Sequence, residues 1–155
     1  MSPLILHTCF LRQYDELNRI LGDVEVLAER RSFMPAALRF GEFRIELERH
    51  LSDEERVLLP QFVQHGGDSQ TVERIVATRT DIVLSVNRVG AALSQSEYAG
   101  FCASMTALDR ALDAHRHDEE TIIHPALEHL LKNDTDWDEM RAKAHFAESP
   151  LVGVH

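Results

Sequence analysis

Two copies of one short motif contain the residues of this sequence that are best suited to chemistry. The shared pattern is H-x-x-x-E-E-x-x-x-x-P, which begins at His50 in the first motif and at His115 in the second. Residues four apart lie one above the other on a helix, so each His and the Glu that follows, Glu54 or Glu119, can reach the same ion. A chance match is expected at roughly one His in a few thousand. Two matches in one chain therefore indicate a site.

Both His–Glu pairs fall on the apolar faces of their predicted helices, where an unpaired carboxylate is costly. A cation or a set of hydrogen-bond donors must therefore neutralise Glu54 and Glu119. Imidazole and carboxylate ligands suit iron, zinc or manganese, and we expect iron first. The alternative, an exposed salt-linked pair on a solvated helix face, agrees less well with the apolar neighbours and with the doubled motif.

Two further residues lie at the level of these pairs along the predicted helices. His7, near the start of the first helix, is expected to be a fifth metal ligand; the alternative is a core histidine that is hydrogen-bonded to a neighbour. Arg79, early in the third helix, cannot ligate a metal because it carries a positive charge and offers no lone pair. We expect its guanidinium to pair with Glu54 or Glu119, unless the helix is rotated and the side chain reaches the surface.

The remaining histidines are assigned no metal. His117 lies two residues from His115 and so points to the opposite helix face. His124 stands where the first motif has Leu59, which predicts a packing role. The second Glu of each motif, Glu55 or Glu120, is expected at the surface or as an acceptor for a ligating His.

Four long stretches with apolar residues three and four positions apart must position these side chains, which predicts an all-α fold. The stretches cover about residues 4–30, 35–64, 69–93 and 94–133. Asp68 offers an N-cap for the third helix, with inward residues that include Val76, Arg79 and Val83, while Ser94 and Glu97 have capping-box spacing for the fourth. Short connections between long neighbours favour an antiparallel up-down-up-down four-helix bundle.

Residues 1–133 are expected to form this bundle, and residues 134–155 a short C-terminal helical tail that packs on it and carries no chemistry. A chain of 155 residues with 44% hydrophobic content can bury a core without disulfides. The formal net charge of -10 argues against nucleic acid and anionic membranes as partners. The N-terminus has no cationic leader and no stretch is long enough to span a bilayer, so a cytoplasmic location is expected.

The doubled H-x-x-x-E motif and His7 resemble the hemerythrin-like (HHE cation-binding) family over about residues 4–133. The resemblance implies a non-haem di-iron centre in which His7 and His50 hold one iron, His115 helps to hold the other, and Glu54 and Glu119 bridge. It also implies binding or sensing of dioxygen, nitric oxide or peroxide, or iron handling. The sequence departs from the family on the third helix, where Arg79 occupies the position of a ligating His.

This departure leaves the ligand set incomplete, so one tightly held ion, or none, is expected rather than a full pair. The alternative function is a metal-free bundle that acts as a structural or protein-interaction module, in which Arg79 replaces the cations. An enzyme is less expected than a binding or sensing protein, because no acid-base pair or substrate pocket can be named. A homo-oligomer is compatible with the sequence.

Overall fold

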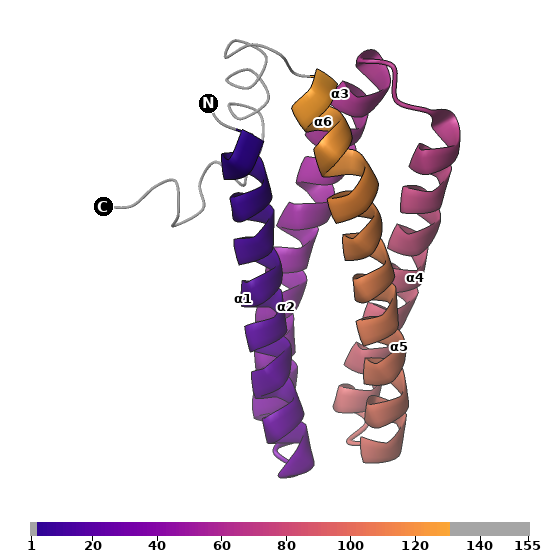
Figure 1. Ribbon diagram of the computed structural model, residues 1–155. Coiled ribbons are helices and arrows are strands. Elements are labelled where there is room, and N and C mark those ends of the chain that lie inside the picture. The colour runs from indigo at the N-terminus through magenta and orange to yellow at the C-terminus, as the bar shows by residue number, and fades with distance from the viewer. Residues whose placement is uncertain (1–2, 131–155) are drawn as a thin grey trace.

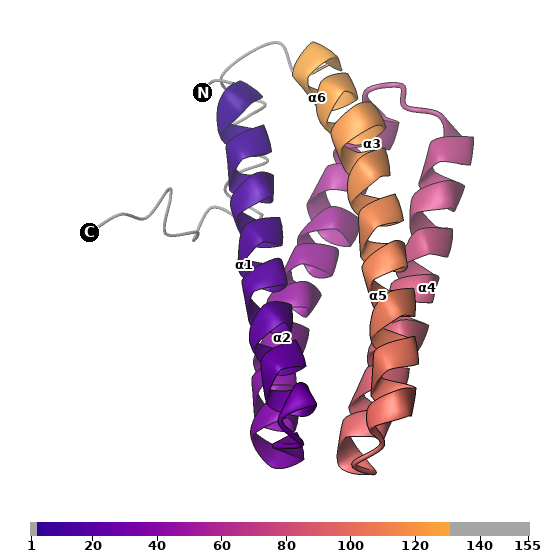
Figure 2. The ribbon, with the colours of Figure 1, turned by 60° about the horizontal axis from the view of Figure 1, so that its bottom comes forward.

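Four helical rods run alternately in opposite directions along the molecule (Figures 1 and 2). The computed structural model describes residues 3–130, and the side chains of residues 9–129. All elements within these residues are helices: α1 (Pro3–Glu29), α2 (Phe33–Asp53), η1 (Glu54–Leu58), α3 (Leu59–Gln64), α4 (Ser69–Ser94), α5 (Tyr98–Asp118), η2 (Glu119–Ile123) and α6 (His124–Leu130). The predicted all-α, up-down-up-down bundle is confirmed.

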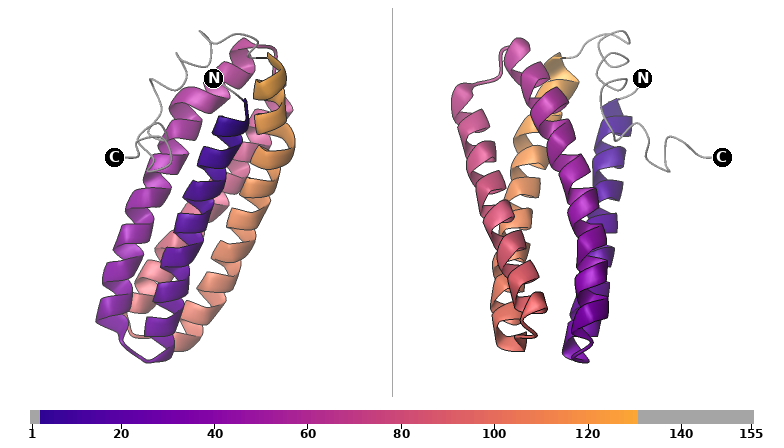
Figure 3. Two further views of the ribbon diagram at one scale, coloured as in Figure 1. Left: turned by 60° about the vertical axis from the view of Figure 1, so that its left-hand side comes forward. Right: turned by 180° about the vertical axis from the view of Figure 1, so that it is seen from behind.

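Two π-helical turns join shorter helices into the second and fourth rods. The second rod runs through α2, η1 and α3, and the fourth runs through α5, η2 and α6. α1 packs against α2, α4 packs against α5, and α2 contacts α4. α3 and α6 meet at the end of the bundle that also holds the start of α1 (Figure 3).

The turns between the rods confirm one predicted cap and correct another. Asp68 precedes α4 and accepts a hydrogen bond from the Thr71 backbone N–H at 2.6 Å, as an N-cap should. The capping box predicted for Ser94 and Glu97 is wrong, because Ser94 is the last residue of α4 and Glu97 is itself the N-cap of α5. The Glu97 N–H donates to the Ala92 carbonyl at 2.9 Å, so it completes the end of α4 instead.

The buried face of α4 lies one residue away from the predicted one. Ile75 and Ile82 are fully buried, whereas Val76 and Val83 are 48% and 45% exposed. The sequence holds two parallel apolar stripes, offset by one residue and thus by about 100° on the helix. The larger isoleucines face the core, and this rotation moves Thr78 inward and Arg79 outward.

The apolar core is divided into two clusters along the bundle. The larger fills the half that is distant from α3 and α6 and includes Leu17, Phe40, Phe43, Val89 and Leu108. The smaller surrounds α3 and α6 and contains Cys9, Phe10, Val57, Leu58, Leu59, Phe62, Ile75, Ile123 and Leu127. Along the second and fourth rods, the buried polar residues of the two motifs lie between the residues that belong to the two clusters.

The predicted helical tail lies outside the described residues, so the division of the chain at residue 133 stays a prediction. Among the described helices, none combines the length and the apolar character that a bilayer span requires.

Candidate metal centre

Each motif contains a π-turn that begins at its first glutamate. The backbone N–H of Leu59 donates to the Glu54 carbonyl five residues earlier, and the N–H of His124 donates to Glu119 in the same way. The prolines that follow, at positions 60 and 125, have no N–H and cannot continue the ordinary ladder of helical hydrogen bonds. The repeated spacing therefore produces the same widened turn twice, a feature that is often found at functional sites.

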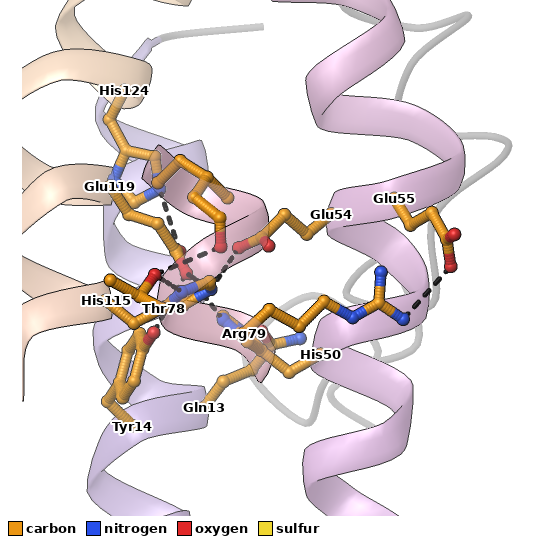
Figure 4. A network of polar contacts seen from close by, with 11 residues as sticks. Gln13, Tyr14, His50, Glu54, Glu55, Thr78, Arg79, His115, Glu119 and His124 are labelled. Carbon is orange, nitrogen blue, oxygen red and sulfur yellow. Dashed lines mark hydrogen bonds and ion pairs between the residues drawn. The ribbon is translucent and has the colours of Figure 1, made fainter. Parts of the chain in front are cut away.

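The two turns bring four side chains together inside the bundle (Figure 4). His50 and Glu54 come from the second rod, and His115 and Glu119 from the fourth; all four are at most 1% exposed. One ligand atom from each residue lies within 4.8 Å of the others. The four metal ligands predicted from the doubled motif thus share one buried cluster.

Each histidine contacts a glutamate of the other motif. His115 Nε2 lies 2.6 Å from Glu54 Oε2, and His50 Nε2 lies 3.0 Å from Glu119 Oε1. His115 Nε2 also lies 3.0 Å from Glu119 Oε1 within its own motif. The imidazole Nε2 atoms and the carboxylate oxygens therefore converge on the centre.

Residues of α1 and α4 hold these groups in place from outside. Gln13 Oε1 lies 2.7 Å from His50 Nδ1, and Thr78 Oγ1 lies 2.7 Å from His115 Nδ1. Because an amide oxygen can only accept, His50 Nδ1 donates to Gln13, and its Nε2 is directed at the cluster. Tyr14 donates its hydroxyl proton to Glu119 Oε1 at 2.9 Å.

The electrostatics of the cluster follow from burial and from the pairing of opposite charges. Burial and the neighbouring Glu119 carboxylate raise the pKa of Glu54 to about 7. Burial acts to lower the pKa of His115, but hydrogen bonds and attraction to Glu119 and Glu54 outweigh it and raise that pKa to about 10. Burial acts to raise the pKa of Glu119, but attraction to His50 and hydrogen bonds hold it well below its usual range. Without a cation, protons on the imidazoles balance the carboxylates.

The donor set fits a metal ion. Glu54 Oε1 and Glu119 Oε2 are buried and accept no hydrogen bond, although such buried oxygens normally have a partner. Imidazole nitrogen and carboxylate oxygen are ligands of iron, zinc and manganese. Metal binding would release the protons at the Nε2 atoms, since a ligating His must be neutral.

A family model described as the hemerythrin HHE cation-binding domain matches residues 7–127. The chain belongs to the hemerythrin HHE cation-binding family. No curated protein and no solved structure gives a significant match. The family assignment suggests cation binding, and the buried His–Glu cluster supplies four side chains that could hold a metal ion.

Arg79 is the main correction to the sequence-based site of this hemerythrin-like chain. Its guanidinium donates to Glu55 Oε2 at 3.0 Å on the outer surface, rather than to Glu54 or Glu119 (Figure 4). The rotation of α4 explains the difference, because it places Thr78 at the position facing His115. Glu55 is accordingly a surface residue, as expected.

The other histidines divide into three cases. His7 lies in α1, but its side chain is outside the described residues, so its role as a ligand stays a prediction. His117 is exposed, as predicted. His124 packs against Phe10, with ring centroids 4.5 Å apart, and its Nε2 also lies 3.8 Å from Glu119 Oε2.

Sequence reasoning missed the supporting residues Gln13, Tyr14 and Thr78. Tyr14 lies on the apolar stripe of the first helix, where packing is the simplest interpretation, although a buried tyrosine hydroxyl normally has a polar partner. Thr78 was hidden by the choice of the wrong stripe on α4. Gln13, next to Tyr14, carries no signal in the sequence beyond that adjacency.

Proposed function

We propose that this hemerythrin-like protein holds non-haem iron at the centre formed by His50, Glu54, His115 and Glu119. We further propose that it binds or senses a small ligand such as dioxygen, nitric oxide or peroxide, or handles iron. One observation carries the proposal: His–Glu pairs from both motifs converge, and two of their buried carboxylate oxygens accept no hydrogen bond. A buried carboxylate oxygen that accepts no hydrogen bond favours a cation beside it.

The surroundings of the centre support a small ligand over a large substrate. Iron bound there would supply coordination positions that the protein leaves open, at which a small molecule can bind. The four residues are at most 1% exposed, so a bulky substrate cannot reach them from the surface of the folded bundle. Tyr14 and Thr78 fix the glutamate and the histidine of the second motif by direct hydrogen bonds, which favours a preformed site.

The direct test is the metal content of the protein. We expect protein that is reconstituted anaerobically with iron(II) and then desalted to retain iron, as measured by elemental analysis. Glu54→Ala and His50→Ala should lose most of it, because each removes an inward ligand. His117→Ala is the matched control, since His117 is exposed on the same helix as His115. Equal retention in all variants, or none in the wild type, would contradict the proposal.

The identity of the ligand needs a second measurement on iron-loaded protein. We expect the visible and near-ultraviolet spectrum to change on addition of nitric oxide or on exposure to air, because the ligand binds at the iron. Zinc-loaded protein is the control, since zinc has no redox chemistry and would give no such change. An iron-loaded protein with an unchanged spectrum would favour iron handling over ligand sensing.

A metal-free interaction module is the alternative, and one observation favours it. The contacts from His115 to Glu54 and from His50 to Glu119 already pair the opposite charges of the cluster without an ion. We further propose that the protein is cytoplasmic. The net charge of -10 supports the proposal that nucleic acid and anionic membranes are not its partners. Elemental analysis distinguishes this alternative from metal binding.

A further inference from the structure

His124 breaks the repeat between the two motifs at a buried position. The first motif ends in Leu59 before its proline, and the second ends in His124 at the equivalent place. Both residues follow a π-turn and both are buried, with 8% and 2% of their surface exposed. An apolar residue meets the needs of packing at this place, as Leu59 shows. A buried imidazole there calls for a different explanation.

The carboxylate of Glu119 is used unequally by its neighbours. Its Oε1 atom receives the contacts from Tyr14 at 2.9 Å, from His50 at 3.0 Å and from His115 at 3.0 Å. Its Oε2 atom accepts no hydrogen bond and points to the side where His124 lies. The open oxygen of the carboxylate and the additional imidazole therefore face each other.

The distance between these two atoms suits a shared ion better than a direct bond. His124 Nε2 and Glu119 Oε2 are 3.8 Å apart, beyond the range of a hydrogen bond. Two ligands that each lie about 2.1 Å from one ion are separated by about 3.4 Å in a tetrahedral site and by about 4.2 Å when they lie on opposite sides of the ion. The observed separation of 3.8 Å lies between these values, so small shifts of the two side chains would bring both atoms onto one ion.

We propose that His124 is a further metal ligand of this protein, acting with Glu119 Oε2 at the end of the centre nearest α6. The proposal rests on the proposed function. α4 contains no histidine between Ser69 and Ser94, and its inward residue at this level is Thr78. The second motif therefore provides, from the fourth rod, an imidazole that the third rod lacks. Glu119 would then join the two ends of the centre through its two oxygens.

The competing role of His124 is packing against Phe10, whose ring centroid lies 4.5 Å from that of the imidazole. His124→Leu distinguishes the two roles, because it installs the residue that the first motif already accommodates. The metal-free variant should keep the helical content and the melting temperature of the wild type. His124→Gln, a polar residue of similar length, serves as a second variant if leucine disturbs the fold.

The experiment is an anaerobic iron(II) titration against a competing chelator, repeated with cobalt(II), whose visible spectrum reports the number and type of its ligands. We expect His124→Leu to lose one ion per chain, or to bind with an affinity reduced by more than about 100-fold, the upper end of the effect for residues that only support a ligand. The cobalt spectrum should change as well. His117→Leu is the control and should behave like the wild type.

The outcomes separate this proposal from the proposed function. If His50→Ala weakens binding and His124→Leu leaves stoichiometry, affinity and cobalt spectrum unchanged, His124 only packs and this inference is wrong. If the wild type binds neither metal, both fail.

Discussion

The Nε2 atom of His115 lies 2.6 Å from the Oε2 atom of Glu54, which makes the histidine of the second motif a direct partner of the glutamate of the first. Both side chains are at most 1% exposed. Neither motif is therefore complete on its own, and a site forms only when the second and fourth rods are packed together.

This pairing predicts strong coupling in the metal-free protein. Removing one partner of a buried ion pair leaves an uncompensated charge, so we expect Glu54→Gln or His115→Gln to cost about 3–5 kcal/mol of unfolding free energy each. The double variant should cost clearly less than the sum. Chemical denaturation measures all three. The exposed pair of Arg19 and Glu16 is the control, with an expected coupling of about 0–1 kcal/mol.

The stability of the metal-free protein should fall as the pH rises from about 6.5 to about 10, the usual and the raised pKa of His115. A raised pKa means that the folded state binds the proton more tightly, so the stabilisation is complete below 6.5 and disappears through 10. Glu54 acts in the same direction between its usual pKa of 4.5 and about 7. Glu119, whose pKa is lowered, loses its contribution as the pH falls below its usual value.

We therefore expect an optimum in mildly acidic solution, measured as unfolding free energy at a series of pH values with a chelator present. In His115→Gln the decline between pH 6.5 and 10 should be much smaller. A wild-type protein that gains stability across this interval would show that the imidazole is not held in its charged form.

Adjacent residues of α4 should differ sharply in their effect on the centre. Thr78→Val removes the partner of His115 Nδ1 at nearly constant volume, so we expect metal affinity to fall by about 10- to 100-fold. Arg79→Ala breaks a surface ion pair with Glu55 and should leave metal affinity unchanged, with a stability effect of about 0–1 kcal/mol. A competition titration compares the two. A larger loss in Arg79→Ala would mean that α4 is rotated toward the face predicted from the sequence.

Tyr14 should act through Glu119. Tyr14→Phe keeps the ring in its packing position but removes the 2.9 Å hydrogen bond to Oε1, so we expect metal affinity to fall by about 10- to 100-fold. The buried carboxylate also loses a donor, at a cost of about 1.5–3 kcal/mol in the metal-free protein. Tyr98 begins α5, at the opposite end of the bundle from α3 and α6, and Tyr98→Phe is the control for both measurements.

The parts of this structure that can be predicted from the sequence are those where the helical spacing of apolar residues leaves only one possible buried face. His50, Glu54, His115 and Glu119 are separated by one helical turn within apolar stripes, and this was sufficient to place them inward. The face of α4 was not predictable in the same way, because Ile75 and Val76 begin two apolar stripes and only packing against α5 selects one. The role expected for Arg79 depends on that choice, and the contact between Thr78 and His115 becomes visible only once the correct stripe is known.

The sequence contains a signal for the two π-turns, but that signal is ambiguous. In each motif, a proline follows the second glutamate by five residues and interrupts the helical hydrogen bonds. A proline can also produce a simple kink in an α-helix, so its presence alone does not predict a π-turn. The position of His124 relative to Glu119 depends on the wide turn. A packing role was therefore the natural interpretation of the sequence alone, and its contact with Phe10 confirms that part.

A layer of charged groups separates the two apolar clusters, so the two halves of the bundle need not unfold as a single cooperative unit. The smaller cluster, around α3 and α6, joins the larger through the His–Glu layer, so we expect it to open locally at a lower free energy than global unfolding. Such opening would give ions and small molecules a path to ligands that are closed off in the folded state. A bound cation would link the two halves. The amide hydrogens of α3 and α6 should then exchange more slowly in the metal-loaded protein than in the metal-free protein.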